Sequence, residues 1–397
     1  MTRLTTSLAA AVLLSMTLVA CGRTSTPPDE RQPSATSEPS DASPDETDEP
    51  VESGGEPEDP SPGQTPGVPT VTATVASGLA VPWGIAFLPD GSAIVTERDS
   101  RRVLRLVLTS EGDAPQAAEI IELGEIEEAV PEVEAGLLGV AVSPDFVNDN
   151  TLFFYATTAD DNSVFKVTLD GDQLGQPTPI LTGIPKGVIH DGGRLEFGPD
   201  GFLYVSTGET GDATRAQDFR SLAGKILRIT SEGDSAPGNP EPDSPVWSLG
   251  HRNVQGLAFD DAGQLWASEF GDSTFDELNL VTPGGNYGWP LVEGTGGEPD
   301  YVDPLLTWST EDASPSGLAF ADGMLWMAAL RGQRLWQIPL TGDRAGEPVG
   351  LLTGEYGRIR TVVTTPDGDL WVATSNRDGR GEPAADDDRI LLVSLGD

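Results

Sequence analysis

A hairpin pattern that recurs six times is the feature that most constrains the fold of this 397-residue chain. Each copy is a short alternating strand, a turn of the Pro-Asp-Gly kind and a second alternating strand, as in "GIAFLPDGSAIVTE" from residue 84 and "RLEFGPDGFLYVST" from residue 194. Proline presets such a turn, and glycine accepts the positive φ that it requires. Further copies start at residues 139, 256, 317 and 361, so the turns lie roughly 45 to 62 residues apart.

That spacing leaves room for one four-stranded blade in every repeat, and no amphipathic helical stretch of useful length lies between the copies. We therefore predict an all-β fold, a six-bladed β-propeller, over residues 71–397. A seven-bladed ring and a pair of β-sandwiches are the alternatives. Ligands of propellers usually bind at one mouth of the central channel, so functional residues are expected on the loops that lead into the innermost strands.

The first 70 residues have a different composition. Residues 1–20 are predicted to be a lipoprotein signal peptide, because an apolar run too short for an ordinary membrane span ends in Leu-Val-Ala before Cys21. A diacylated Cys21, the only cysteine in the chain, would anchor the protein to the outer face of a bacterial membrane. A plain signal peptide with a chance cysteine is the alternative. Residues 21–70 are rich in Pro, Ser, Asp and Glu and are expected to form a disordered tether.

Charge and histidine content narrow the functional classes. The formal net charge of −41 makes nucleic acid and anionic lipid headgroups unexpected partners. Of the two histidines, His190 lies just before the inner strand of the third hairpin, in "VIHDGGRLEFGPDG", and His251 lies just before that of the fourth. We therefore expect both histidines at the same mouth of the channel.

Arginines gather in equivalent loops. Arg252 follows the second histidine, Arg331 ends the fifth hairpin, and Arg358 and Arg360 lead into the sixth, where their alternation puts both on one side of the strand. In so acidic a chain, converging guanidinium groups indicate a small polycarboxylate ligand. Pairing of each arginine with an acid of the protein is the alternative.

A loop from residue 268, "SEFGDSTFDELNLVTPGGNYGWP", combines glycines with carboxylates. Such a loop suits an oxygen-ligated cation such as calcium, although its spacing is not that of an EF-hand. A solvated acidic turn is the alternative.

Six motifs occur together and in order: "HDGGRLEFGPDG", "GHRNVQGLAF", "DELNLVTPGGNYGWP", "SPSGLAF", "ALRGQRL" and "RIRTVVTTPDG". The combination resembles the soluble aldose sugar dehydrogenases that depend on pyrroloquinoline quinone (PQQ), also called glucose/sorbosone dehydrogenases, over about residues 74–394. The resemblance implies an extracytoplasmic oxidoreductase that oxidises aldose sugars at C1 to the lactone. It also implies PQQ and calcium as cofactors. The sequence does not identify the electron acceptor, although an enzyme tethered outside the membrane could pass electrons to an external quinone or cytochrome.

The resemblance assigns roles to single residues. His190 would be the general base on the anomeric hydroxyl, and Arg252 would polarise the quinone oxygen. Glu134 lies where some members contact the sugar with a glutamine. The cofactor would be held by Asn253, Trp308, Arg331, Arg358 and Arg360.

The implied calcium sites lie in the acidic loop. Backbone carbonyls of Gly271 and Asp272 would bind a calcium ion next to the cofactor, and Glu277 with the carbonyl of Tyr287 would bind a second, structural ion. The loop departs from the family pattern, which often has proline where Asp272 stands and histidine where Phe270 stands.

Two other functions are compatible with a six-bladed propeller. One is a calcium-dependent lactonase, which needs acidic and amide side chains around a central metal rather than His and Arg. The other is a binding propeller that has lost its cofactor, which the altered Gly271–Asp272 pair favours and the retained His and Arg set disfavours.

Overall fold

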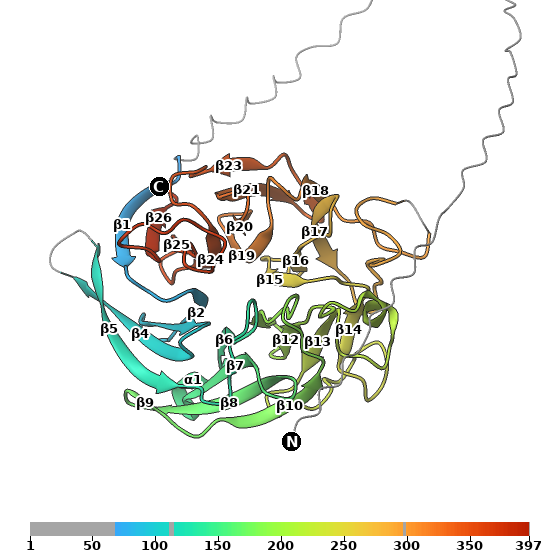
Figure 1. Ribbon diagram of the computed structural model, residues 1–397, viewed down its shortest axis with the longest axis horizontal. Coiled ribbons are helices and arrows are strands. Elements are labelled where there is room, and N and C mark those ends of the chain that lie inside the picture. The colour runs from blue at the N-terminus through green and yellow to red at the C-terminus, as the bar shows by residue number, and fades with distance from the viewer. Residues whose placement is uncertain (1–67, 111–114, 297–298, 397) are drawn as a thin grey trace, which may run out of the picture. The chain divides into compact units, whose positions relative to one another are not determined.

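The computed structural model describes residues 68–110, 115–296 and 299–396 of the chain. The predicted signal peptide with Cys21, and nearly all of the predicted tether, lie outside these residues. Six antiparallel sheets are arranged around a central axis, so the predicted six-bladed β-propeller is confirmed (Figure 1).

Each predicted hairpin forms the two inner strands of one blade. Blade 1 contains β2 (Pro82–Phe87), β3 (Ala93–Glu97), β4 (Arg102–Ser110) and β5 (Pro115–Glu125). Blade 2 contains β6 (Leu137–Val142), β7 (Thr151–Thr157), β8 (Asn162–Asp170) and β10 (Thr178–Ile184), with the short β9 (Gln173–Leu174) on β8. Blade 3 contains β11 (Leu195–Phe197), β12 (Leu203–Ser206), β13 (Lys225–Ile229) and β14 (Val246–Leu249).

The second half of the ring repeats the arrangement. Blade 4 contains β15 (Val254–Phe259), β16 (Leu265–Glu269), β17 (Phe275–Val281) and β18 (Leu306–Ser309). Blade 5 contains β19 (Pro315–Ala321), β20 (Met324–Ala329), β21 (Arg334–Thr341) and β23 (Val349–Leu351), with β22 (Arg344–Ala345) on β21. Blade 6 contains β24 (Ile359–Thr364), β25 (Leu370–Thr374), β26 (Ile390–Ser394) and β1 (Thr70–Ala76).

The ring is closed by β1, which supplies the outer strand of the last blade. It pairs antiparallel with β26, from Thr70 opposite Ser394 to Ala76 opposite Ile390. Two segments more than 300 residues apart thus complete one sheet, which fixes the first and last blades against each other.

The hydrophobic core is divided among the blade interfaces. Six clusters of buried apolar side chains each join neighbouring blades; the one between blades 6 and 1, for example, contains Trp371 and Val95. The alternating strands of the sequence therefore bury both faces, because each blade packs between two others.

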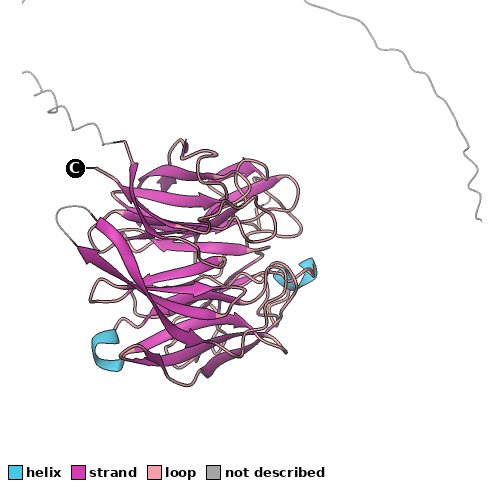
Figure 2. Cartoon of the chain, turned by 60° about the vertical axis from the view of Figure 1, so that its left-hand side comes forward, coloured by secondary structure: helices cyan, strands magenta, loops and turns pink. Residues whose placement is uncertain are grey.

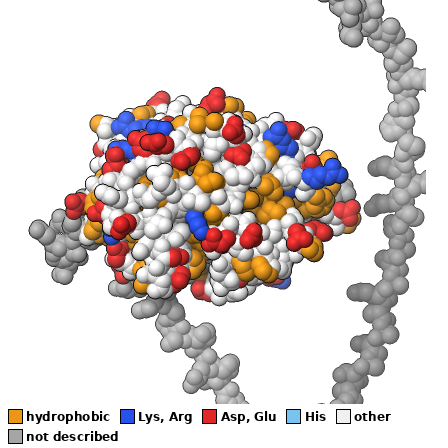
Figure 3. Space-filling model, turned by 90° about the horizontal axis from the view of Figure 1, so that it is seen from below, with side chains coloured by type: hydrophobic (Ala, Val, Ile, Leu, Met, Phe, Trp, Pro, Cys, Tyr) orange, Lys and Arg blue, Asp and Glu red, His pale blue; other side chains and the backbone are white. Residues whose placement is uncertain are grey.

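Helices contribute little to the described residues. They are α1 (Phe146–Asp149), in the inner hairpin of blade 2, and the 3-10 helix η1 (Ala213–Gln217) (Figure 2). In the described part of the chain no helix combines the length and apolar character needed to cross a membrane. Figure 3 shows one edge of the propeller, on which acidic side chains are scattered among fewer basic ones.

The six innermost strands all start at one mouth of the channel, here called the upper mouth, and end at the other, the lower mouth. The loops that carry His190, His251, Arg252 and Arg358 lead into these strands. They therefore lie at the upper mouth.

Candidate active site

His190 is held in a constrained turn between β10 and β11. Its backbone adopts a left-handed conformation with φ of 58°, which is uncommon for a residue with a Cβ. Gly192 follows with φ of 65°, and a Cβ added there would lie only 2.5 Å from the Cα of Thr207. The glycine thus lets the loop pass directly against β12, and the imidazole keeps 15% of its surface exposed.

The His190 ring is oriented by Glu209, a residue that sequence reasoning missed. Nδ1 of the imidazole is hydrogen-bonded to Oε1 of Glu209, whose side chain is buried. The same oxygen accepts a hydrogen bond from the backbone nitrogen of Gly211 at 3.1 Å. Among the described residues the ring has no other partner, so the carboxylate fixes Nδ1 as the protonated nitrogen and leaves Nε2 free to accept a proton.

Glu134, the predicted sugar contact, lies against the same turn. Its Oε2 accepts a hydrogen bond from the backbone nitrogen of His190 at 3.0 Å, and its Oε1 pairs with Arg380 at 2.6 Å. Burial alone would raise the pKa of Glu134, but the hydrogen bond from His190 and the charge of Arg380 outweigh it and lower that pKa. The Glu134 carboxylate is therefore a charged neighbour of the turn that carries His190.

Arg252 and Asn253 approach from the next blade. The Nη2 of Arg252 pairs with Oδ1 of Asp272 at 3.1 Å, and its guanidinium lies 5.3 Å from the centre of the Trp289 ring. Its Nε is buried without a hydrogen-bond partner, so this guanidinium has one donor that the described residues do not satisfy. Asn253 accepts a hydrogen bond from the backbone nitrogen of Gly192 at 3.1 Å and so ties this blade to the His190 turn.

Arg358 and Arg360 lie side by side, as predicted. Both pair with one buried carboxylate, Asp378, at 2.9 and 3.4 Å, and Arg360 also donates to Oε1 of Gln255 at 3.0 Å. Burial lowers the pKa of Arg360 to about 9, although Asp378 acts against it. Two guanidinium groups that share one carboxylate leave positive charge for a ligand anion.

Other predicted residues lie apart from this group. Arg331 is 55% exposed and pairs with Glu311 at 3.1 Å. Trp308 lies on β18, the outermost strand of its blade, and packs in the core cluster between blades 4 and 5 with its ring centre 5.8 Å from that of Trp336. The structure does not bring Trp308 to the channel.

His251 does not share the environment of His190. Its side chain is fully buried, with Nδ1 bonded to Glu269 and Nε2 bonded to Ser248, both at 2.8 Å. It stacks on Tyr287 at a centroid distance of 4.6 Å. Both ring nitrogens are therefore used by the protein, and His251 supports the loop rather than a ligand.

The predicted calcium loop is tightly organised. Backbone nitrogens of residues 272–275 all donate to Oε1 of Glu293, the shortest bond being 2.7 Å from Asp272. A Cβ on Gly271 would come within 1.7 Å of the carbonyl oxygen of Phe275, so only glycine fits there. The side chain of Asp272 is used by Arg252, which leaves the backbone carbonyls as the atoms that could face a cation.

The second predicted site has one buried oxygen that lacks a donor, beside a buried carboxyl. Burial raises the pKa of Glu277 to about 8, and the charge of neighbouring Glu269 adds to this effect. Oδ1 of Asn279, which lies beside them, is buried without a hydrogen-bond partner. No group of three or more His, Cys, Asp or Glu side chains that could hold a metal occurs among the described residues. A cation here would need carbonyl and amide oxygens besides Glu277, and this donor set fits calcium.

Comparison with known proteins identifies the family. Residues 79–391 match the glucose/sorbosone dehydrogenase family. Aldose sugar dehydrogenase YliI of Escherichia coli (strain K12) is 31% identical over 346 residues, which cover 75% of this chain and 88% of that protein.

Solved structures agree. The PQQ-bound form of aldose sugar dehydrogenase from Streptomyces coelicolor has 51% identity and a TM-score of 0.79, covering 83% of this chain and 99% of that chain. The apo-form of soluble aldose sugar dehydrogenase from Escherichia coli has 27% identity and a TM-score of 0.71, covering 83% and 100%. The chain therefore belongs to the glucose/sorbosone dehydrogenase family.

Proposed function

We propose that this chain, an oxidoreductase of that family, oxidises aldose sugars at C1 to the lactone. The proposal is supported mainly by one arrangement: Glu209 binds Nδ1 of His190 and leaves Nε2 unbonded, and the backbone nitrogen of His190 donates to Glu134. Arg252 and the Arg358–Arg360 pair belong to the same mouth of the channel. PQQ, when bound, would supply the two-electron acceptor that takes up the hydride lost from C1.

The residues of the chain would supply the proton chemistry and the charge. Nε2 of His190 removes the proton of the C1 hydroxyl as the carbonyl forms, and Glu209 stabilises the imidazolium that results. The unpaired Nε of Arg252 offers a donor to an oxygen that gains negative charge during the reaction.

The remaining proposed contacts bind and orient the cofactor and the sugar. Arg358 and Arg360 face cofactor carboxylates together with Asn253, whereas Arg331 contributes from the exposed rim. Trp308 is not one of these contacts, because it packs in the core between blades 4 and 5. Glu134 and its partner Arg380 contact the sugar.

Calcium is proposed at both parts of the acidic loop. The carbonyls of Gly271 and Asp272 would bind one ion next to the cofactor, and Glu277 with the carbonyl of Tyr287 would bind another. The orphaned Oδ1 of Asn279 supports the second site.

We also propose that the protein is extracytoplasmic and held at the membrane by a lipid on Cys21. Electrons would leave to an external quinone or cytochrome. Release of a Cys21→Ser variant into the soluble fraction would support the anchor, and unchanged membrane association would contradict it.

Reconstitution tests the enzyme assignment. The full chain is stripped with a chelator, supplied with PQQ and calcium, and followed by dye reduction with a panel of aldoses. We expect activity that requires both additions, and a His190→Gln variant that binds PQQ but has lost turnover by about 10²-fold or more. Absence of PQQ binding would contradict the proposal, and so would a His190→Gln variant that keeps most of its activity.

A further inference from the structure

The inner strands repeat one pattern of small residues, and blade 3 departs from it twice. In four blades the first and third residues of the inner repeat are glycine and alanine. In blade 3 the first of these positions is Arg194 and the third is Glu196. Blade 6 has Thr361 and Val363 at these places. The small residues are Gly84, Gly139, Gly256, Gly317, Ala86, Ala141, Ala258 and Ala319.

Arg194 extends across the channel and divides it. Its Nε donates to the carbonyl of Gln255 at 2.8 Å, and its Nη2 donates to Oγ1 of Thr361 at 3.4 Å. The guanidinium also lies 4.3 Å from the centre of the Trp83 ring. Because Thr361 belongs to the blade opposite to blade 3, the side chain separates the upper site from the lower half of the channel.

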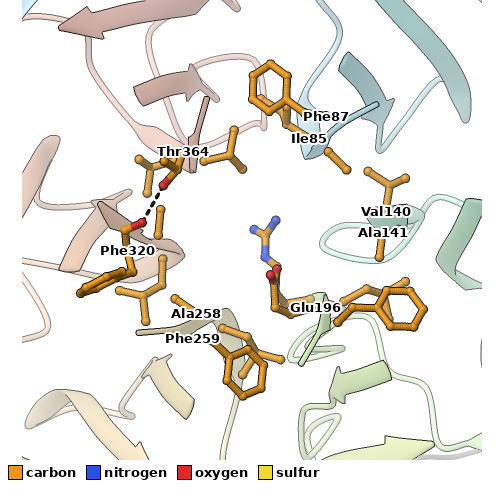
Figure 4. A pocket seen from close by; sticks show the side chains of 18 of the residues that line it. Ile85, Phe87, Val140, Ala141, Glu196, Ala258, Phe259, Phe320 and Thr364 are labelled. Carbon is orange, nitrogen blue, oxygen red and sulfur yellow. Dashed lines mark hydrogen bonds between the residues drawn. The ribbon is translucent and has the colours of Figure 1, made fainter. Parts of the chain in front are cut away.

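Below Arg194 lies a cavity of about 380 Å³, which the lower halves of all six inner strands surround. Phe87, Phe259 and Phe320 are spaced around it with aliphatic side chains between them (Figure 4). Glu196 projects from blade 3 toward the middle of this ring (Figure 4). Arg194 and Glu196 are the only charged residues among those that line the cavity.

Among the described residues, the Glu196 carboxylate has no hydrogen-bond or ion-pair partner. Its charged neighbour Arg194 directs Nε to Gln255 and Nη2 to Thr361 instead. Burial raises the pKa of Glu196 to about 7, although the charge of Arg194 acts to lower it. An unpaired carboxyl in an aromatic cavity costs free energy, and alanine at the same place in four blades shows that the fold does not need it.

We propose that this lower cavity binds a small protonated amine with an apolar body. The ammonium would donate to Glu196, phenylalanine rings at the cavity edge would face the cation and its hydrocarbon part, and the volume suits a ligand of that size. A neutral apolar ligand would leave the carboxylate unpaired, and an anion would be repelled by it. The site is separate from the proposed sugar oxidation, which takes place above Arg194.

The test compares 2-phenylethylamine with its neutral analogue 2-phenylethanol by isothermal titration calorimetry on the full chain. We expect saturable binding of the amine with one site per chain, and no comparable binding of the alcohol. Glu196→Gln, which keeps the shape and removes the charge, should weaken amine binding by about 10- to 100-fold. Ala86→Leu, which fills the cavity without changing any charge, should weaken it too.

A matched control separates this site from general attraction to an acidic protein. Asp261 is an exposed acid outside the cavity, so Asp261→Asn should leave amine binding unchanged. Equal binding of the amine and the alcohol would overturn the proposal. Amine binding that is absent, or that Glu196→Gln leaves intact, would overturn it as well.

Discussion

His190 and Glu209 form a pair in which the carboxylate binds one ring nitrogen and leaves the other free. Glu209 cannot reach a sugar by itself, because its side chain is buried and its Oε1 is shared with the backbone of Gly211. It is therefore a positioning residue, whose effect on the reaction passes through the imidazole. Such a role makes a specific kinetic prediction.

Glu209→Gln should lower kcat on the order of 10²-fold while KM for the sugar changes little, because the amide retains the shape but not the charge that stabilises an imidazolium. The measurement is steady-state dye reduction by the reconstituted enzyme. Glu232 is a suitable control, since it is 66% exposed and pairs with Lys166. Glu232→Gln should have the kcat of the parent enzyme. If Glu209→Gln also kept the kcat of the parent, Glu209 would have no role in the mechanism.

The three arginines proposed for the cofactor should differ in importance. Arg360 is buried, so Arg360→Gln removes a desolvated charged donor and should weaken PQQ binding by about 10- to 100-fold. Arg331 is 55% exposed and already paired, so Arg331→Gln should change the affinity less than about threefold. Titration with PQQ, followed by tryptophan fluorescence, measures both.

The two variants also serve as controls for each other. In Arg360→Gln, the buried carboxylate of Asp378 still has an ion-pair partner, because Arg358 lies 2.9 Å from it. A larger loss of PQQ affinity in Arg331→Gln than in Arg360→Gln would contradict the assignment of the buried pair to the cofactor.

The repeat was accessible from sequence because each hairpin is a local unit. Alternation and turn chemistry act over about a dozen residues, and all six predicted hairpins are the inner strands of blades. The closing pair of β1 and β26 was not predicted, since its partners are more than 300 residues apart and no local pattern specifies which strands meet.

The site was predictable where residues belong to the repeat. Arg358 and Arg360 alternate along the start of one strand, and the structure puts both on Asp378. Asp378 itself was missed because it lies in a loop without a repeated pattern, as was Glu209. An equivalent position in the repeat does not guarantee an equivalent role. His251 precedes its inner strand as His190 does, yet its ring is buried and is hydrogen-bonded by Glu269 and Ser248.

Removal of calcium should leave Glu277 as a buried acid without a counter-charge, which destabilises the fold. Glu277 and Glu269 share a buried region in which burial and mutual charge raise the pKa of Glu277 to about 8. Glu277→Gln should therefore raise Tm in the presence of a chelator and reduce the gain in Tm that calcium gives the parent. Thermal unfolding with chelator and with calcium measures both effects.

The exposed Asp261 again provides the control, because Asp261→Asn should leave the calcium-dependent gain in Tm unchanged. If Glu277→Gln gains as much from calcium as the parent does, Glu277 is not a ligand of the ion.

The pH dependence of stability should contain a contribution from Asp388. This carboxyl is fully buried, one of its oxygens has no hydrogen-bond partner, and burial, with the charge of Asp387, raises its pKa to about 6. The folded chain thus binds this proton more tightly than the unfolded chain, whose aspartate has its ordinary pKa near 3.8. Protonation favours folding, and the contribution is complete below about pH 4 and lost as the pH rises through about 6.

Asp388→Asn removes that titration but keeps an oxygen to accept from the backbone nitrogen of Asn376. Any fixed cost of the amide is the same at every pH, so only the change with pH is diagnostic. The Tm of the variant minus that of the parent should therefore rise between pH 4.5 and pH 7, as the parent loses its protonated carboxyl. A difference that stays constant across this interval would mean that Asp388 titrates alike in the folded and unfolded chain, and that burial does not hold its proton.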